Sequence, residues 1–229
     1  YNMLMSQKEE ANFAFCKYIT KNYLHWFSEP ESRPLMTPDI FKTQVFPFLD
    51  NGEKVFLIVI DNFRYDQWKM VQQTIEEFFT VEKEMLYYSI LPTTTQYARN
   101  ALMSGLMPLQ IKEMYPQYWV DDTEEEAKNL YEENLIGLLL KRYRKNINFS
   151  YHKINSSQEG EKLVEKLPQL KDNQLNVCVL NFIDMLSHSR TEMRVLKEIA
   201  RSETAYRALS VNWFKYSPTL QLFKDLAAS

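Results

Sequence analysis

The sequence predicts an α/β fold in which a mostly parallel sheet is flanked by helices. Six apolar residues, 55–60, run without interruption and stop at Asp61. A continuous aliphatic run of this length is typical of a central parallel strand that is buried on both faces. Beyond it, candidate strands alternate with candidate helices, which is the pattern of a parallel sheet covered on both sides. The sequence also predicts that polar residues following these strands share one edge of the sheet.

The elements follow from hydrophobic periodicity and from turn residues. We expect strands at 54–60, 82–90, 147–154 and 175–183. We expect helices at 65–79, in a short segment ending at Gly105, at 123–143, at 160–167, and in two or three segments from Ser189 onward. Upstream, a helix at 6–27 precedes a linker with three prolines at 28–38, a short helix at 39–49 and a turn at 50–52. These features predict a helical N-terminal segment, 1–52, and a sheet-containing domain, 53–229.

Composition limits the classes of function. The chain has 229 residues, a net charge of −3 and only four glycines, and it contains no Gly-rich nucleotide-binding loop. The charge gives no overall attraction to duplex nucleic acid or to an anionic membrane. No stretch approaches the ~20 apolar residues that cross a bilayer. The two cysteines, Cys16 and Cys178, do not suggest a disulfide framework, so we expect a cytoplasmic protein. Because the chain opens on Tyr1, we expect it to be a piece of a longer one.

The first helix carries an apolar stripe that contains Phe13, Tyr23, Trp26 and Phe27. Such a stripe usually packs on its own domain. A homodimer interface is the alternative, and the sequence leaves both open.

Chemically useful side chains follow three of the predicted strands. Asp61 ends the first, and Thr95 lies at the start of a helix after the second, where it is either an N-cap or a hydroxyl beside a bound anion. Asp184 and His188 follow the last strand and are four residues apart, so both can reach one metal from the same face of a helix. Each signal alone has an ordinary structural explanation. Together they predict one site at the carboxyl edge of the sheet.

The motifs at these positions resemble those of the alkaline phosphatase superfamily. Asp61-Asn62-Phe63-Arg64 is similar to its strand-terminal Asp motif, and LPTTTQYARNALMSG is similar to the nucleophile segment of its phosphodiesterase members. Asp184-x-x-x-His188 resembles its metal-binding pair. The combination with IDNFRYDQW and DMLSHSRTEM most resembles the PglZ-type effector domain of PorX-like response regulators, which control type IX secretion in Bacteroidetes. The resemblance covers the whole chain.

This resemblance implies specific roles. Asp61 and Thr95 would share one Zn²⁺, with Thr95 as the nucleophile, while Asp184 and His188 would hold a second Zn²⁺. Asn62, Arg64 and Asn100 are candidates for contacting the substrate phosphate. Superfamily members carry further Asp and His ligands, but no histidine follows His188. We therefore expect the C-terminal part of the fold to be absent, and the isolated chain to bind zinc weakly and turn over little substrate.

Three functions remain open at this stage. The first is a zinc-dependent phosphodiesterase acting on nucleotide-type substrates, controlled by an upstream receiver domain and its sensor kinase. The second is a non-catalytic effector that binds a partner protein, such as a sigma factor or a secretion component. The third is a Rossmann-like small-molecule binder without a metal.

Overall fold

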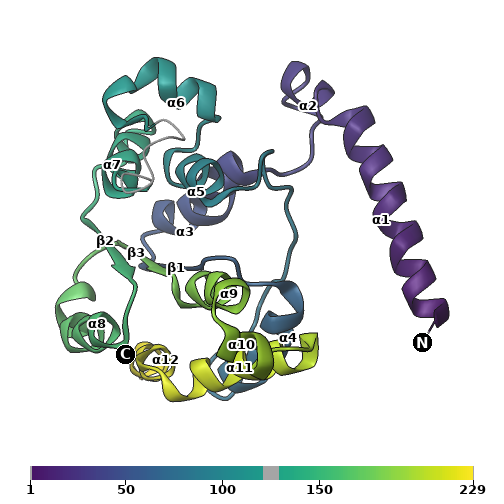
Figure 1. Ribbon diagram of the computed structural model, residues 1–229. Coiled ribbons are helices and arrows are strands. Elements are labelled where there is room, and N and C mark those ends of the chain that lie inside the picture. The colour runs from purple at the N-terminus through teal and green to yellow at the C-terminus, as the bar shows by residue number, and fades with distance from the viewer. Residues whose placement is uncertain (1, 121–128, 229) are drawn as a thin grey trace.

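A three-stranded parallel sheet forms the centre of the molecule in the computed structural model, which describes residues 2–120 and 129–228 (Figure 1). Its strands are β1 (Val55–Ile60), β2 (Phe149–Ile154) and β3 (Leu175–Leu180), in the spatial order β1-β3-β2. All three run in register, so that Ile60 and Ile154 both pair with Leu180. The strands therefore end level with one another, and the expected α/β fold with a parallel sheet is confirmed.

The central strand is β3 and not the run at 55–60. All six residues of β3 are buried, whereas every residue of β1 is only partly buried. The prediction that 55–60 is a central strand buried on both faces was wrong, because among the described residues β1 pairs with β3 on one side only. An uninterrupted apolar run shows that both faces of a strand are apolar, but it does not identify the neighbours along each edge.

Helices cover both faces of the sheet. One face packs against α3 (Phe46–Asp50), α5 (Thr95–Ser104) and α7 (Glu132–Arg142), and its core includes Val177 and Val179 of β3. The other face packs against α8 (Ser157–Leu170) and α12 (Pro218–Ala227), and Cys178 belongs to that core. Successive β3 residues thus alternate between the two cores, as the pleat of a strand requires.

The remaining elements surround this layered centre. They are η1 (Thr37–Asp39), η2 (Phe41–Val45), α4 (Tyr65–Ile75), α6 (Pro108–Met114), η3 (Pro116–Tyr118), α9 (Phe182–Glu192), α10 (Arg194–Ile199) and α11 (Glu203–Tyr216). The expected helices at 65–79 and 160–167 correspond to α4 and α8. Part of the helix expected at 123–143 falls at 121–128, outside the described residues, and the described part corresponds to α7.

The strand expected at 82–90 is absent. This segment is extended, and its one ladder contact is an isolated parallel bridge between Tyr88 and Met36. Residues 82–87 are all exposed, and Leu86 is among the most exposed apolar side chains of the described chain. The apolar residues that suggested a strand do not lie against the sheet, so no ladder forms there.

The N-terminal helices are α1 (Asn2–Asn22) and α2 (His25–Ser28), and Figure 1 shows α1 projecting away from the sheet. No residue of α1 is buried, whereas Trp26 of α2 is 7% exposed and packs with Met36, Ile90 and Ala101. Core packing therefore holds for Trp26 and for Tyr23, which packs against the same cluster. It does not hold for Phe13, which is 62% exposed.

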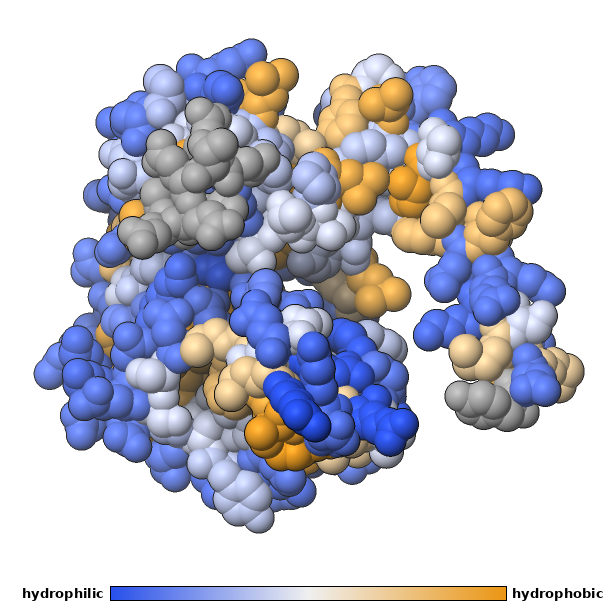
Figure 2. Space-filling model, in the orientation of Figure 1, coloured by the Kyte–Doolittle hydropathy of each residue, from blue (hydrophilic) through white to orange (hydrophobic). Residues whose placement is uncertain are grey.

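Figure 2 shows apolar side chains gathered on the surface of these N-terminal helices. The large apolar residues exposed there are Met3, Leu4, Met5, Phe13, Phe15, Tyr18, Leu24 and Phe27. Among the residues that the structure describes, no helix combines the length and apolar character needed to cross a membrane.

Candidate functional site

A cleft of about 660 Å³ opens at the carboxyl edge of the sheet. Segments far apart in the sequence line it: the residue after β1, the start of α5, the end of β2, and the segment from Asn181 into α9. The lining residues are Asp61, Pro92, Thr94, Thr95, Gln96, Tyr97, Arg99, Asn129, Lys153, Asn181, Asp184 and His188. The structure thus brings Asp61, Thr95, Asp184 and His188 to one cleft, at the edge where open α/β sheets bind ligands.

The end of the sheet holds Asp61 in place. Its backbone N–H donates to the Leu180 carbonyl over 3.0 Å, which ties the end of β1 to the end of β3. The next residue, Asn62, has a φ of 55° and turns the chain sharply out of the sheet. Asparagine tolerates this left-handed conformation better than most residues. The Asp61 carboxylate is therefore held directly after the end of β1, at the carboxyl edge of the sheet.

Thr95 is the first residue of α5 and is not its N-cap. The N-cap is Thr94, and its side chain makes no capping hydrogen bond. The Thr95 hydroxyl likewise makes no hydrogen bond with the described residues. The simple capping role considered for Thr95 from the sequence is therefore wrong. Its hydroxyl lies beside the N-terminal amides of α5, where backbone N–H groups and the helix dipole favour an anion.

Asp184 and His188 lie one turn apart on α9, and Asp184 Oδ1 is 3.7 Å from His188 Nε2. Burial raises the pKa of Asp184, and the charge of Asp61 raises it further. The carboxylates of Asp61 and Asp184 are therefore close enough for their negative charges to repel, although 123 positions separate them in the chain. Two carboxylates held close together favour a proton or a cation between them.

A buried arginine, which the sequence reasoning missed, holds this site together. The side chain of Arg99 is 6% exposed, and its Nη1 donates to Asp61 Oδ2 over 3.0 Å and to Asn181 Oδ1 over 2.9 Å. Its Nε donates to Glu132 Oε1 over 2.7 Å, and Nη2 pairs with the second Glu132 oxygen. Arg99 follows Thr95 by four residues on α5, so helical spacing places both on the same face. That spacing is the signal from which the sequence could have identified it.

Glu132 of α7 completes the network. Its side chain is fully buried, and Tyr151 of β2 donates its hydroxyl to Glu132 Oε2 over 2.5 Å. Burial raises the pKa of Tyr151, and the Glu132 charge adds to this. Burial alone would lower the pKa of Arg99, but the neighbouring Glu132 and Asp61 raise it. Arg99 thus links the candidate nucleophile helix to β1, to β3 and to α7.

Two further polar residues line the cleft without a partner. Lys153 lies at the end of β2, is half-buried, and makes no hydrogen bond or ion pair with the described residues. Asn129 is 9% exposed, and none of the described residues donates a hydrogen bond to its buried Oδ1. Neither residue belongs to a motif, so no sequence pattern indicates a role for them.

The three residues expected to contact phosphate lie outside the lining of the cleft. Asn62 is exposed, and its Nδ2 lies 3.4 Å from Asp184 Oδ1. Arg64 pairs with Asp66 and Glu203 and lies over the Tyr206 ring, so α4 and α11 hold its guanidinium. Asn100 is half-buried on α5, and its Oδ1 has no partner. Their roles in substrate binding remain predictions.

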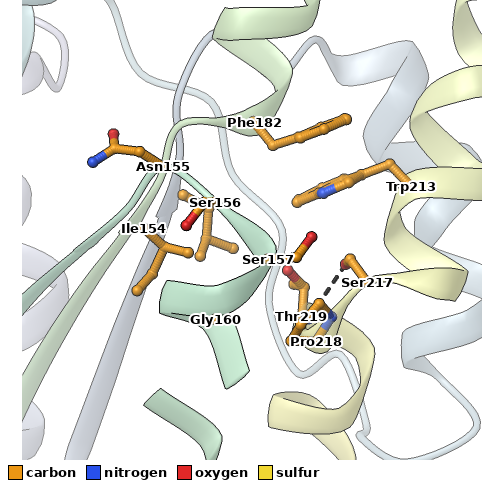
Figure 3. Close-up of a pocket in the computed structure, with 11 residues that line it drawn as sticks. Ile154, Asn155, Ser156, Ser157, Gly160, Phe182, Trp213, Ser217, Pro218 and Thr219 are labelled. Atoms are coloured by element: carbon orange, nitrogen blue, oxygen red, sulfur yellow. Dashed lines mark hydrogen bonds between the residues drawn. The ribbon is translucent and has the colours of Figure 1, made fainter. Parts of the chain in front are cut away.

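A second pocket lies near the same edge, between the N-termini of α8 and α12 (Figure 3). Phe182 and Trp213 stack over it with ring centroids 4.9 Å apart, and the Ser217 hydroxyl accepts a hydrogen bond from the Thr219 amide. Its volume of about 20 Å³ accommodates roughly one water molecule. This pocket is therefore too small for a phosphate ester, and the larger cleft is the candidate site.

The donors in the cleft fit a divalent cation by their chemistry. Carboxylates from Asp61 and Asp184 and the imidazole of His188 are the ligand types that zinc and manganese accept. Among residues 2–120 and 129–228, however, no three His, Cys, Asp or Glu side chains are arranged so that they could hold a metal ion. Asp61 already has a cationic partner in Arg99, and the His188 side chain is 69% exposed.

Residues 40–228 match the family model of the PglZ alkaline phosphatase-like domain, described from the BREX system. This match covers most of the chain. The chain belongs to the PglZ family. Residues 1–27 match a second model, the PorX response regulator linker domain. No curated protein matches the chain at a significant level.

The two family matches indicate the kind of protein to which the cleft belongs. A PglZ domain is alkaline phosphatase-like, which relates the chain to the phosphoesterase hydrolases. The PorX-type linker at its start relates it to response regulators, whose effector domains are joined to a receiver domain. The suspected PglZ-type effector of a PorX-like regulator is therefore confirmed at the level of family.

Proposed function

We propose that this PglZ domain is a metal-dependent phosphoric ester hydrolase in which Thr95 is the nucleophile. The observation that carries this proposal is the meeting of Thr95, Asp61, Asp184 and His188 in one cleft at the carboxyl edge of the sheet. Asp61, Thr95, Asp184 and His188 would hold the metal, which we propose to be Zn²⁺ at two sites. Bound divalent cations would activate the hydroxyl and offset the charge that develops on the phosphoryl oxygens.

The residues of the chain contribute the remaining steps. The Thr95 oxygen attacks phosphorus, the bond from phosphorus to the leaving alcohol breaks, and the phosphoryl group is left on Thr95. Water then displaces Thr95 and releases the phosphate product. The N-terminal amides of α5 face the same space and favour the anionic phosphoryl group. Arg99 keeps Asp61 oriented during both steps.

We propose phosphodiesters of nucleotide type as the substrates. This preference rests on the resemblance of the segment around Pro92–Thr95 to the nucleophile segment of phosphodiesterases. We further propose that the protein acts in the cytoplasm as the effector of a two-component regulator of type IX secretion. Asn62, Arg64 and Asn100 would contact the substrate only after rearrangement, because none of them lines the cleft.

Contacts at the linker support control by an upstream receiver domain. The linker match ends at residue 27 and includes Tyr23 and Trp26. The Tyr23 hydroxyl accepts a hydrogen bond from the Leu91 amide over 2.7 Å, and the Trp26 ring packs against Tyr88 with centroids 4.9 Å apart. Leu91 precedes Thr95 by four residues. A displacement of the linker would therefore reach the segment that positions the nucleophile.

Detection of the covalent intermediate tests the proposal even where turnover is slow. The chain is incubated with bis(p-nitrophenyl) phosphate and Zn²⁺ or Mn²⁺, quenched in acid, and digested for mass spectrometry. One nitrophenolate leaves in the first step, so we expect a p-nitrophenyl phosphoryl group on the peptide that contains Thr95, and we expect the Thr95→Ser variant to retain the modification. A wild-type rate of nitrophenol release equal to that of Thr95→Ala would contradict the assignment of Thr95.

A non-catalytic effector is the second candidate, and one observation favours it. Asp61 is already paired with Arg99, and the described residues contain no three-ligand metal cluster. In that case the domain would act by binding a sigma factor or a secretion component. The two functions differ in the labelling experiment, because a non-catalytic effector leaves no phosphoryl group on Thr95 at any metal concentration.

A further inference from the structure

We propose that Lys153 is a substrate-binding residue that contacts the anionic phosphoryl oxygens of a phosphate ester in the cleft. This inference rests on the proposed hydrolase function and adds a residue to it. Lys153 lies in none of the three motifs at the strand ends, and its position follows only from the fold.

The register of β2 directs Lys153 toward the cleft. Tyr151 donates to Glu132 of α7, so its side chain lies on the face of the sheet that α5 and α7 cover. Lys153 is two residues further along the strand and shares that face, one step nearer the carboxyl edge. Ile154, on the opposite face, packs with the core formed by α8 and α12. Lys153 thus lies above the Glu132–Arg99 pair, where it lines the cleft.

Lys153 is an ammonium group without a fixed partner. A half-buried lysine usually pairs its charge with a carboxylate or sends its head group into water. Among the described residues Lys153 makes no hydrogen bond or ion pair. Burial lowers the pKa of Lys153, and so does the charge of Arg99, while the charges of Glu132 and Asp61 oppose this shift. Both carboxylates are instead bonded to Arg99. The ammonium is therefore available to an anion that enters the cleft.

Arg99 cannot take this role in the arrangement observed. A guanidinium has five N–H donors, and four hydrogen bonds from Arg99 go to Asp61, Asn181 and Glu132. Arg99 is therefore a positioning residue, whereas none of the described residues occupies the donors of Lys153. Asn129 adds a buried amide oxygen, Oδ1, which accepts no hydrogen bond from the described residues, to the same cleft. Asn129 Oδ1 accepts hydrogen bonds, so a ligand that carries both an anionic group and a donor, such as the phosphate and a sugar hydroxyl of a nucleotide, would satisfy both residues.

Titration calorimetry with inorganic phosphate tests the proposal, with Mn²⁺ present and the full chain in the cell. Loss of a hydrogen bond to a charged group predicts that Lys153→Met weakens phosphate binding about tenfold or more. We expect Lys153→Arg to restore most of the affinity, since it keeps the charge. Lys215→Met is the matched control, because Lys215 is exposed on α11 and does not line the cleft. Melting curves check that each variant is folded.

The outcomes separate this inference from the proposed function. Equal phosphate affinity of the wild type and Lys153→Met overturns the role of Lys153, and so does a wild type that binds no phosphate. Phosphate binding that depends on Lys153, without any label on Thr95, supports the anion site and counts against the hydrolase. If Thr95 is labelled but phosphate binding does not depend on Lys153, the hydrolase function is supported and the role of Lys153 is overturned. In the diester assay we expect Lys153→Met to raise KM more than it lowers kcat.

Discussion

Arg99 Nη1 lies 3.0 Å from Asp61 Oδ2, so the carboxylate that ends β1 is held by a cation from the helix that begins with Thr95. This contact joins the two motifs that the sequence presents 34 positions apart. It fixes one Asp61 oxygen and leaves Oδ1 without a hydrogen bond from the described residues. The position of the Asp61 carboxylate therefore depends on Arg99, which is not one of the proposed reactive or metal-binding residues.

The first prediction concerns this buried pair. Replacing Arg99 with Met leaves Glu132 charged and fully buried without its partner, and the free energy of unfolding should fall by about 3–5 kcal/mol. The double variant Arg99→Met/Glu132→Gln removes both charges and keeps an acceptor for the Tyr151 hydroxyl. We expect it to be more stable than the single variant in urea denaturation. Equal stability of the two variants would show that the buried charge is not the cause.

The second prediction compares two glycines with positive φ. Gly105 ends α5 at a φ of 62°, and a Cβ built there would lie 2.9 Å from Leu139 Cδ1. Gly52 has a φ of 81° and open space around it. Both Ala variants carry the left-handed strain of roughly 1–2 kcal/mol. Gly105→Ala should be the less stable of the two, as measured by thermal unfolding, because it adds crowding against α7.

The third prediction concerns the thiols. Burial raises the pKa of Cys178 to about 12, whereas Cys16 is exposed. At pH 8 the Cys178 thiolate is scarce, so we expect one fast reaction with an aromatic disulfide reagent and a second reaction only after unfolding. The Cys16→Ser variant should lose the fast phase. A fast phase that persists in this variant would contradict the burial of Cys178, a β3 residue, against α8.

The fourth prediction tests how the N-terminal helices attach. Trp26→Ala removes a ring that is 7% exposed and packed on Tyr88, and it should cost about 3–5 kcal/mol of stability. Phe13→Ala is the matched control, since Phe13 is 62% exposed and should change stability by less than about 0.5 kcal/mol. Urea denaturation measures both. A large loss for Phe13→Ala would indicate that α1 is buried in solution, as in a homodimer.

Part of the fold could be predicted because it depends on local patterns. The apolar run at 55–60, the polar turn after it and the helix-forming residues after Thr95 each identify an element by short-range periodicity. The segment at 82–90 shows the limit of this approach. Its composition resembles that of a strand, but a strand also needs a neighbouring backbone, and within the described part of the chain only Met36 supplies a bridge.

The candidate site, like the fold, could be predicted only in part. The sequence by itself determined which residues follow the strands, and parallel strands in register bring such residues to one edge, so Asp61, Thr95, Asp184 and His188 could be placed together in advance. Only the tertiary structure decided that β3 is central, that Arg99 binds Asp61, and that Lys153 remains unpaired in the cleft. Those features depend on which side chains meet across strands and helices distant in sequence. Local periodicity carries no information about such pairings.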